Sequence, residues 1–142
     1  MMTVTPNQSR AMNAYQREAV LSASPARLLT MLYDRLLLDL NRAETAQISE
    51  DWDTARENLL HAQDIVSELS GSLQRDAWDG AEQLLGIYNF AGTALMTANI
   101  QRNAALTREC IDIFEPLRTT WHEAATLPAG TLSGATAEGI MS

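Results

Sequence analysis

The chain has 142 residues, of which 46% are hydrophobic, and its ten basic and eighteen acidic residues give a net charge of −8. This length and composition predict a single domain with an ordinary apolar core. The negative charge argues against nucleic acid or an anionic membrane surface as a partner, because both require a cationic face on the protein.

The sequence predicts a cytoplasmic protein. Residues 1–10 have no apolar stretch of the kind that secretory signals carry. No run of about 18 uncharged apolar residues occurs, so no membrane-spanning segment is expected. The single cysteine, Cys110, excludes an internal disulfide and suits a reducing compartment.

The N-terminal part is predicted to contribute a short helix and little else. Residues 1–11 are polar and are expected to be disordered. Residues 12–21 have a weak helical pattern with Tyr15 and Val20 towards one side, and they are too short to be stable alone. We therefore expect this segment to lie on the apolar face of the helix that follows it.

That following helix has a clear start signal and an unusually broad apolar surface. Ser24 is a good N-cap, and Pro25 suits the first helical position. At 100° per residue, one apolar arc spreads over roughly 180°, and Met31 and Leu38 form a second strip among charged residues. The members of the broad arc are Leu28, Leu29, Leu32, Tyr33, Leu36, Leu37 and Leu40, and the charged residues around the second strip are Arg27, Arg35, Asp39 and Arg42. Such a helix must be covered from more than one direction, either within its own fold or by a partner.

Three further helices are predicted, over Asp51–Leu73, Trp78–Gln101 and Ala104–Ala125, with a kink near Pro116. Residues 128–142 are rich in Ala, Gly, Ser and Thr and are expected to form a disordered tail. The connections between the helices are short, which favours antiparallel neighbours. The predicted fold is all-α: an antiparallel up-and-down four-helix bundle over residues 12–127, with the short N-terminal helix packed on it.

Candidate catalytic and metal-ligating residues are few. His61 follows Glu57 by four residues, but both fall on the polar side of their helix, and a solvated pair is the favoured interpretation. His122 is placed near a helix end, where a cationic side chain suits the helix dipole. Cys110 lies on an apolar face without a base nearby, so we predict that it is a core residue. We therefore expect no catalytic site, metal site or cofactor.

Tyr33 and Asp34 allow two interpretations. In the first, Tyr33 packs in the core with its hydroxyl at the rim, and Asp34 is solvated. In the second, the two residues border a groove that binds a peptide. The physical pattern of the sequence by itself favours the first interpretation.

The segment from Val20 to Asp34, preceded by Tyr15, resembles the flagellin export chaperone family, FliS. The family pattern is V-x-(T/S)-A-S-P-x-x-L-(x)-x-M-L-Y-D, and this chain carries VLSASPARLLTMLYD. Weaker matches follow in order at 62–69, 85–90, 98–100 and 117–121. The resemblance therefore extends from about Tyr15 to Trp121.

The resemblance implies a cytoplasmic export chaperone that binds the C-terminal segment of flagellin. The client would be unfolded until it wraps around the bundle and becomes partly helical there, as in helix-in-groove recognition. Binding would prevent premature polymerisation before secretion through the flagellar export apparatus. The flagellin-binding residues that the resemblance implies are Tyr15, Val20, Leu21, Ser24, Leu28, Leu29, Leu32, Tyr33, Asp34 and Leu36.

Partners and assembly are expectations of the same kind. Components of the flagellar export gate are a further expected partner, and the chaperone is expected to be a monomer or a weak dimer. The alternative interpretation is a structural helical bundle that uses its surplus apolar surface to self-associate and has no peptide client.

Overall fold

The computed structural model describes residues 24–74, 76 and 78–127. Within them the chain forms four helices and no strand: α2 (Pro25–Ile48), α3 (Trp52–Ser72), α4 (Ala81–Ile100) and α5 (Ala104–Ala125). The predicted all-α class is therefore confirmed. The predicted N-terminal helix over 12–21, with Tyr15, Val20 and Leu21, and the predicted disordered ends lie outside the described residues.

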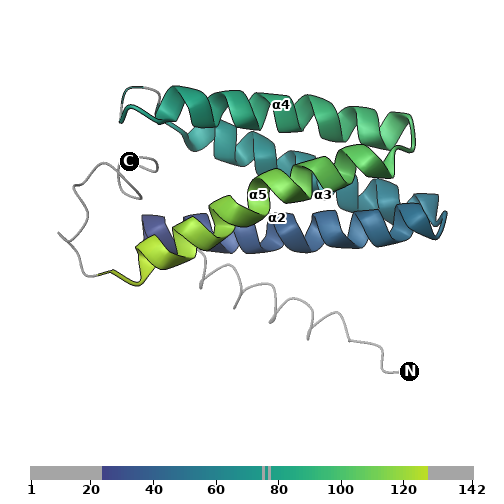
Figure 1. Cartoon of the computed structure of the whole chain (residues 1–142), viewed down its shortest axis with the longest axis horizontal. Helices are drawn as coiled ribbons and strands as arrows, with labels where there is room; N and C mark the ends of the chain where they lie inside the picture. Colours follow the sequence, from purple (N-terminus) through teal and green to yellow (C-terminus); the bar gives the residue numbers. More distant parts are fainter. Residues whose placement is uncertain (1–23, 75, 77, 128–142) are drawn as a thin grey trace, which may run out of the picture.

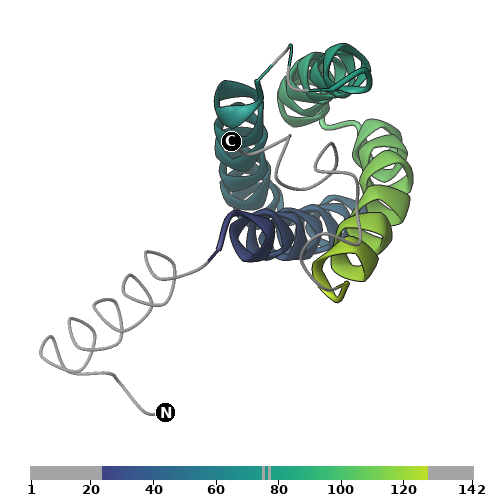
Figure 2. The same cartoon turned by 90° about the vertical axis from the view of Figure 1, so that its left-hand side faces the viewer.

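The four helices form an antiparallel up-and-down bundle, as Figure 1 shows. Viewed along the bundle, each helix occupies one corner of a square, and consecutive helices are neighbours (Figure 2). Helix α2 packs extensively against both α3 and α5, whereas α4 and α5 have the least extensive contact of the four neighbouring pairs. Helix α5 begins beside α4 and ends beside α2, so α4 and α5 diverge towards one end of the bundle.

Side-chain caps explain where three of the helices begin. The Ser24 hydroxyl accepts a hydrogen bond from the Arg27 N–H at 3.1 Å, and Pro25 follows at the first helical position, as predicted. The Asp51 carboxylate caps α3, and the Asn103 side chain accepts from two N–H groups of α5. These caps act within one turn, which is why the sequence located these helix starts to within a residue.

Helix α4 begins three residues later than predicted, because residues 78–80 form a turn. The helix starts at Ala81, with Gly80 as its N-cap. A Cβ atom at position 80 would lie 2.0 Å from the ring of Trp78, so only glycine fits beneath this indole. The tight packing of Trp78 over Gly80 therefore decides where the turn ends and the helix begins.

The core is built from aromatic and leucine side chains of all four helices. Tyr33 of α2, Tyr88 of α4 and Phe114 of α5 are fully buried at its centre, and the Phe114 ring lies within 6.3 Å of both tyrosine rings, centroid to centroid. Leucines fill the remaining space: Leu29, Leu36, Leu40, Leu59, Leu69 and Leu95. The amphipathic faces that the sequence predicted therefore meet as expected, with Leu60 of α3 and Phe90 of α4 left outside.

Candidate functional site

The orientation of α5 is fixed by ionic contacts with α2. Arg108 donates two hydrogen bonds to Glu44, and Arg118 donates one to Asp34. At 100° per residue, Ile113 and Leu117 lie on the opposite flank of α5 from these arginines. That flank faces α4, the other neighbour of α5. Both apolar side chains are only partly buried there.

Helix α4 presents a matching flank. Asn99 of α4 lines a cavity together with residues of α3, so the side of α4 that carries Asn99 faces α3. Ile87 lies about 120° around the helix from Asn99 and therefore faces α5. Ile87 is partly buried, and Phe90, one turn further along, is 46% exposed. We call the surface formed by Ile87, Phe90, Ile113 and Leu117 the α4–α5 groove.

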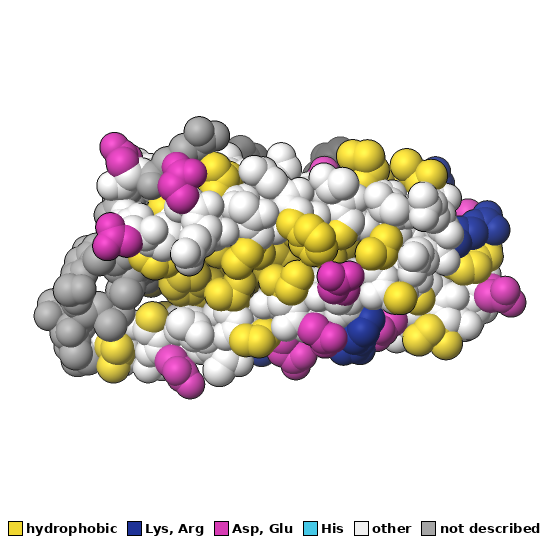
Figure 3. Space-filling view, turned by 45° about the horizontal axis from the view of Figure 1, so that its top comes forward, with side chains coloured by type: hydrophobic (Ala, Val, Ile, Leu, Met, Phe, Trp, Pro, Cys, Tyr) yellow, Lys and Arg dark blue, Asp and Glu magenta, His cyan; other side chains and the backbone are white. Residues whose placement is uncertain are grey.

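Figure 3 looks directly at this surface. A recessed band of hydrophobic side chains runs between α4 and α5, with mostly white and charged surface on either side of it. The band follows from the limited contact between the two helices, since side chains that would be covered at a closer approach stay partly open to solvent. Pro116 lies in the diverging half of α5, where it removes one backbone N–H donor from the helix.

The α2 side of α5 is closed by a small charged cluster. The Asp34 Oδ1 atom accepts hydrogen bonds from Arg118 Nε and His122 Nε2, both at 2.6 Å. Burial alone would raise the pKa of Asp34, but the hydrogen bonds from His122 and Arg118 outweigh it, so this pKa lies below its ordinary value. The cluster joins the start of α2 to the end of α5.

The predicted site residues on α2 fall into two groups in this structure. Leu29, Tyr33 and Leu36 are fully buried in the core. Leu28, Leu32 and Asp34 are partly exposed, and Ser24 is exposed at the N-cap. Leu28 and Leu32 are therefore the apolar members of the predicted set that a client could touch without opening the bundle.

The first interpretation of Tyr33 and Asp34, a core tyrosine beside a solvated aspartate, is correct only in part. Tyr33 does pack in the core, but its hydroxyl is at the buried centre, within 2.8 Å of the Tyr88 hydroxyl, rather than at the rim. Asp34 is engaged by two cationic side chains of α5 rather than simply solvated. The His122 interaction is likewise a specific contact with another helix, which the sequence did not reveal because its partner lies 88 residues away.

Asp39, one of the charged residues around the Met31 and Leu38 strip, is buried in the structure. Its side chain is 0% exposed; Oδ1 accepts from Arg35 Nε at 3.0 Å, and Oδ2 has no hydrogen-bond partner among the described atoms. His61 of α3 lies 3.8 Å from Oδ2 and is itself half exposed. Burial raises the pKa of Asp39, although Arg35 and His61 oppose this effect. His61 therefore faces Asp39 and Arg35 of α2.

Among residues 24–74, 76 and 78–127, no group of three or more His, Cys, Asp or Glu side chains could hold a metal ion. Cys110 is fully buried, as predicted, and burial together with the nearby Glu109 raises the pKa of its thiol to about 12.

The sequence places the groove residues on their helices but does not show that they stay uncovered. By helical periodicity, Ile87, Ile113 and Leu117 lie on the apolar faces of their helices, and Phe90 lies outside the main face of α4. One feature of the sequence could have distinguished groove residues from core residues. The apolar face of α4 is so broad that a single neighbouring helix cannot cover all of it. Helix periodicity cannot say which edge of a broad face remains open.

None of the helices in the described ranges is both long and apolar enough to cross a membrane. Residues 7–128 match the family model described as "Flagellar protein FliS". Among curated proteins, the chain is similar to the flagellar secretion chaperone FliS of Bacillus subtilis (strain 168), with 30% identity over 111 residues, 78% of this chain and 83% of the relative. It is also similar to the proteins of the same name from Campylobacter jejuni, at 29% identity over 80% of this chain and 89% of the relative, and from Escherichia coli (strain K12), at 27% over 78% and 83%.

Proposed function

This chain belongs to the FliS family of flagellar secretion chaperones, and we propose that it is a cytoplasmic chaperone for the C-terminal segment of flagellin. It holds that segment before secretion through the flagellar export apparatus and so prevents premature polymerisation. The relatives are named as chaperones, a role that requires no catalysis, and the proposed activity is binding alone. It uses no cofactor.

The observation that carries the proposal is the α4–α5 groove. It is recessed, apolar and flanked by helices (Figure 3), which is the surface that an amphipathic client helix requires. A client helix with apolar residues at i, i+3 and i+7 would complete the burial of Ile87, Ile113 and Leu117. The same apolar client residues would then be unavailable for contacts between flagellin molecules.

The size of the groove implies that the client extends beyond it. Completing the burial of three partly exposed aliphatic side chains contributes about 2–4 kcal/mol, and the matching client side chains contribute about as much again. Ordering an unfolded client costs about 2–5 kcal/mol, whereas a micromolar dissociation constant requires about 8 kcal/mol. The groove alone is therefore too small, and the client wraps onto further surfaces, among which Leu28 and Leu32 of α2 are the predicted candidates.

Calorimetry with the flagellin C-terminal peptide of the same organism tests the proposal. We expect a one-to-one complex with a dissociation constant below about 1 μM, weakened at least tenfold, about 1.4 kcal/mol, by Ile113→Glu. Leu60→Glu is the matched control, because Leu60 is 47% exposed on α3, away from the groove. Circular dichroism shows whether each variant stays folded.

The alternative is a bundle that uses the groove to bind a second copy of itself. Sedimentation velocity separates the two: a chaperone remains mainly monomeric at micromolar concentration and binds the peptide. A stable dimer that Ile113→Glu dissociates, together with no heat on peptide addition, would replace the chaperone proposal with the self-association model.

A further inference from the structure

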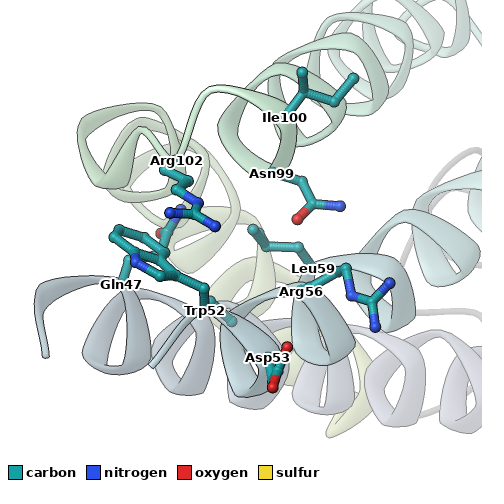
Figure 4. Close-up of a pocket in the computed structure, with 9 residues that line it drawn as sticks. Gln47, Trp52, Asp53, Arg56, Leu59, Asn99, Ile100 and Arg102 are labelled. Atoms are coloured by element: carbon teal, nitrogen blue, oxygen red, sulfur yellow. The ribbon is translucent and has the colours of Figure 1, made fainter. Parts of the chain in front are cut away.

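A second recess lies at the opposite side of α4, where the α2–α3 and α4–α5 turns come together. It has a volume of about 340 Å³ and is separate from the α4–α5 groove. Its lining includes Trp52, Arg56 and Leu59 of α3 and, from α4 and the turn after it, Asn99 and Arg102. Figure 4 shows Arg102 lying over Trp52, and Asn99 and Leu59 near the middle of the recess. We call this recess the arginine pocket.

Arg102 is held in place by its backbone and by stacking. It has a φ of 53°, a left-handed conformation at a helix end that glycine or asparagine usually occupies. Its guanidinium carbon is 4.8 Å from the centroid of the Trp52 ring. Stacking on an aromatic face leaves the N–H groups at the edge of the guanidinium able to donate to a planar acceptor.

The two pocket arginines differ from three other arginines of the bundle in that they have no carboxylate partner. Arg35, Arg108 and Arg118 each pair with a carboxylate. Among the residues that the structure describes, neither Arg56 nor Arg102 forms such a pair. The chain as a whole has a net charge of −8, whereas this pocket brings together two arginines that lack a paired carboxylate.

The chemistry of the pocket selects a carboxylate attached to an apolar group. Guanidinium groups match carboxylate oxygens, and the first turn of α3 adds the positive end of a helix dipole beside Trp52. Trp52 and Leu59 provide apolar cover for a neighbouring side chain. Asp53 also lines the pocket, but it points away from Arg102 in Figure 4. It therefore offsets part of the positive charge without occupying the site.

We propose that the arginine pocket binds the C-terminal carboxylate of the client together with the side chain of the client's last residue. This inference rests on the proposed function, in which the client is the C-terminal segment of another chain. It assigns that segment a fixed end point, with Arg102 on the carboxylate and Trp52 and Leu59 on the final side chain. The Arg56 side chain points away from Arg102 in Figure 4, so it adds positive charge at the edge of the pocket rather than a second contact with the carboxylate. The pocket thereby sets the register of the client along the bundle.

The test compares two client peptides of one sequence, a free acid and a C-terminal amide, by calorimetry. We expect the amide to bind about tenfold more weakly to the unmodified protein, because the charge-assisted hydrogen bonds are lost. Arg102→Gly should weaken the free acid about tenfold and leave the amide unchanged. Glycine suits the positive φ at this position, so the variant removes the guanidinium without straining the turn.

Arg42→Gln is the matched control, since Arg42 is exposed on α2 and does not line the pocket. It should leave both peptides unchanged, and the melting temperature of each variant reports folding. Equal binding of the acid and the amide would overturn the pocket assignment while the proposed function stands. Equal weakening of both peptides by Arg102→Gly would also overturn it, because the arginine would then act on something other than the terminal carboxylate. If neither peptide bound, the proposed function would fail and this inference with it.

Discussion

The hydroxyl oxygens of Tyr33 and Tyr88 lie 2.8 Å apart at the buried centre of the bundle, although the residues are 55 positions apart in the chain. Each hydroxyl is the partner of the other, and burial raises the pKa of both phenols, so the pair stays neutral. One hydrogen bond therefore joins α2 to α4 across the diagonal of the square.

Removing both hydroxyls should cost less than the sum of the costs of removing each one alone. Tyr33→Phe or Tyr88→Phe leaves the other buried hydroxyl without its partner, which we expect to lower the free energy of unfolding by about 1–3 kcal/mol. The double variant should lose less than the sum of the two single losses, because no hydroxyl is then left unpaired. Urea unfolding of the four proteins measures this coupling. Additive losses would mean that the hydrogen bond contributes nothing specific.

The Asp34 cluster should make stability depend on acid pH. Because the pKa of Asp34 is lowered in the folded state, its contribution is present above the unfolded pKa and is lost as the pH falls through the folded value. The difference in unfolding free energy between the natural protein and Asp34→Asn should therefore shrink as the pH falls below about pH 4.

The control for this prediction removes the two donors. In an Arg118→Gln, His122→Gln background, burial alone acts on the pKa of Asp34 and raises it, so the contribution of Asp34 should no longer be lost on acidification. Urea unfolding at several pH values measures both series. A contribution that still shrinks below about pH 4 without the donors would assign the effect to another group.

Cys110 should be unreactive in the folded protein. Its side chain is 0% exposed and its thiol pKa is raised to about 12, chiefly by burial, so almost no thiolate is present near neutral pH. We expect a disulfide reagent at pH 8 to react only at the rate at which the bundle opens. Unfolding in urea should restore the rate of an ordinary cysteine. Rapid reaction of the folded protein would contradict the burial of this thiol.

The N-terminal segment is predicted to compete with the client. Residues 12–21 carry Tyr15 and Val20 but are too short to be helical alone, so they need apolar cover of the kind that the client also seeks. If their docking contributes about 1–2 kcal/mol, deletion of residues 1–18 should tighten client binding about 5- to 30-fold.

Tyr15→Ala distinguishes competition from direct contact with the client. Under competition it tightens peptide binding and speeds amide exchange in residues 12–21 before the client is added. If Tyr15 instead clasps the client, the variant binds more weakly, and an unchanged melting temperature would show that the bundle itself is intact. The second result would discard the competition model.

Much of the fold could be predicted because its signals are local. The caps at Ser24, Asp51 and Asn103 act within one turn, and the apolar periodicity of each helix identifies the side that faces the core. The start of α4 was missed because it depends on Trp78 folding back over Gly80, a contact that no propensity scale contains. The family signature around Ser24 was equally local, since it lies within one segment of sequence.

The candidate site was harder to predict, because it depends on which apolar residues remain uncovered. Tyr33 and Leu36 lie in the apolar run that organises α2, yet α3, α4 and α5 bury them completely. Ile113 and Leu117 have the same apolar character in the sequence, but the limited contact between α4 and α5 leaves them partly open. Apolar character alone does not distinguish a core residue from a binding residue.

The sequence by itself therefore determined the helices, the polarity of their faces, the antiparallel order and the family. Only the tertiary structure decided that Asp34 is held by α5, that Asp39 is buried, and that Arg102 and Trp52 meet at one pocket. The physical reason is distance along the chain. Caps and periodicity act over a few residues, whereas ion pairs, buried charges and the width of a groove depend on how closely helices from distant parts of the chain approach one another.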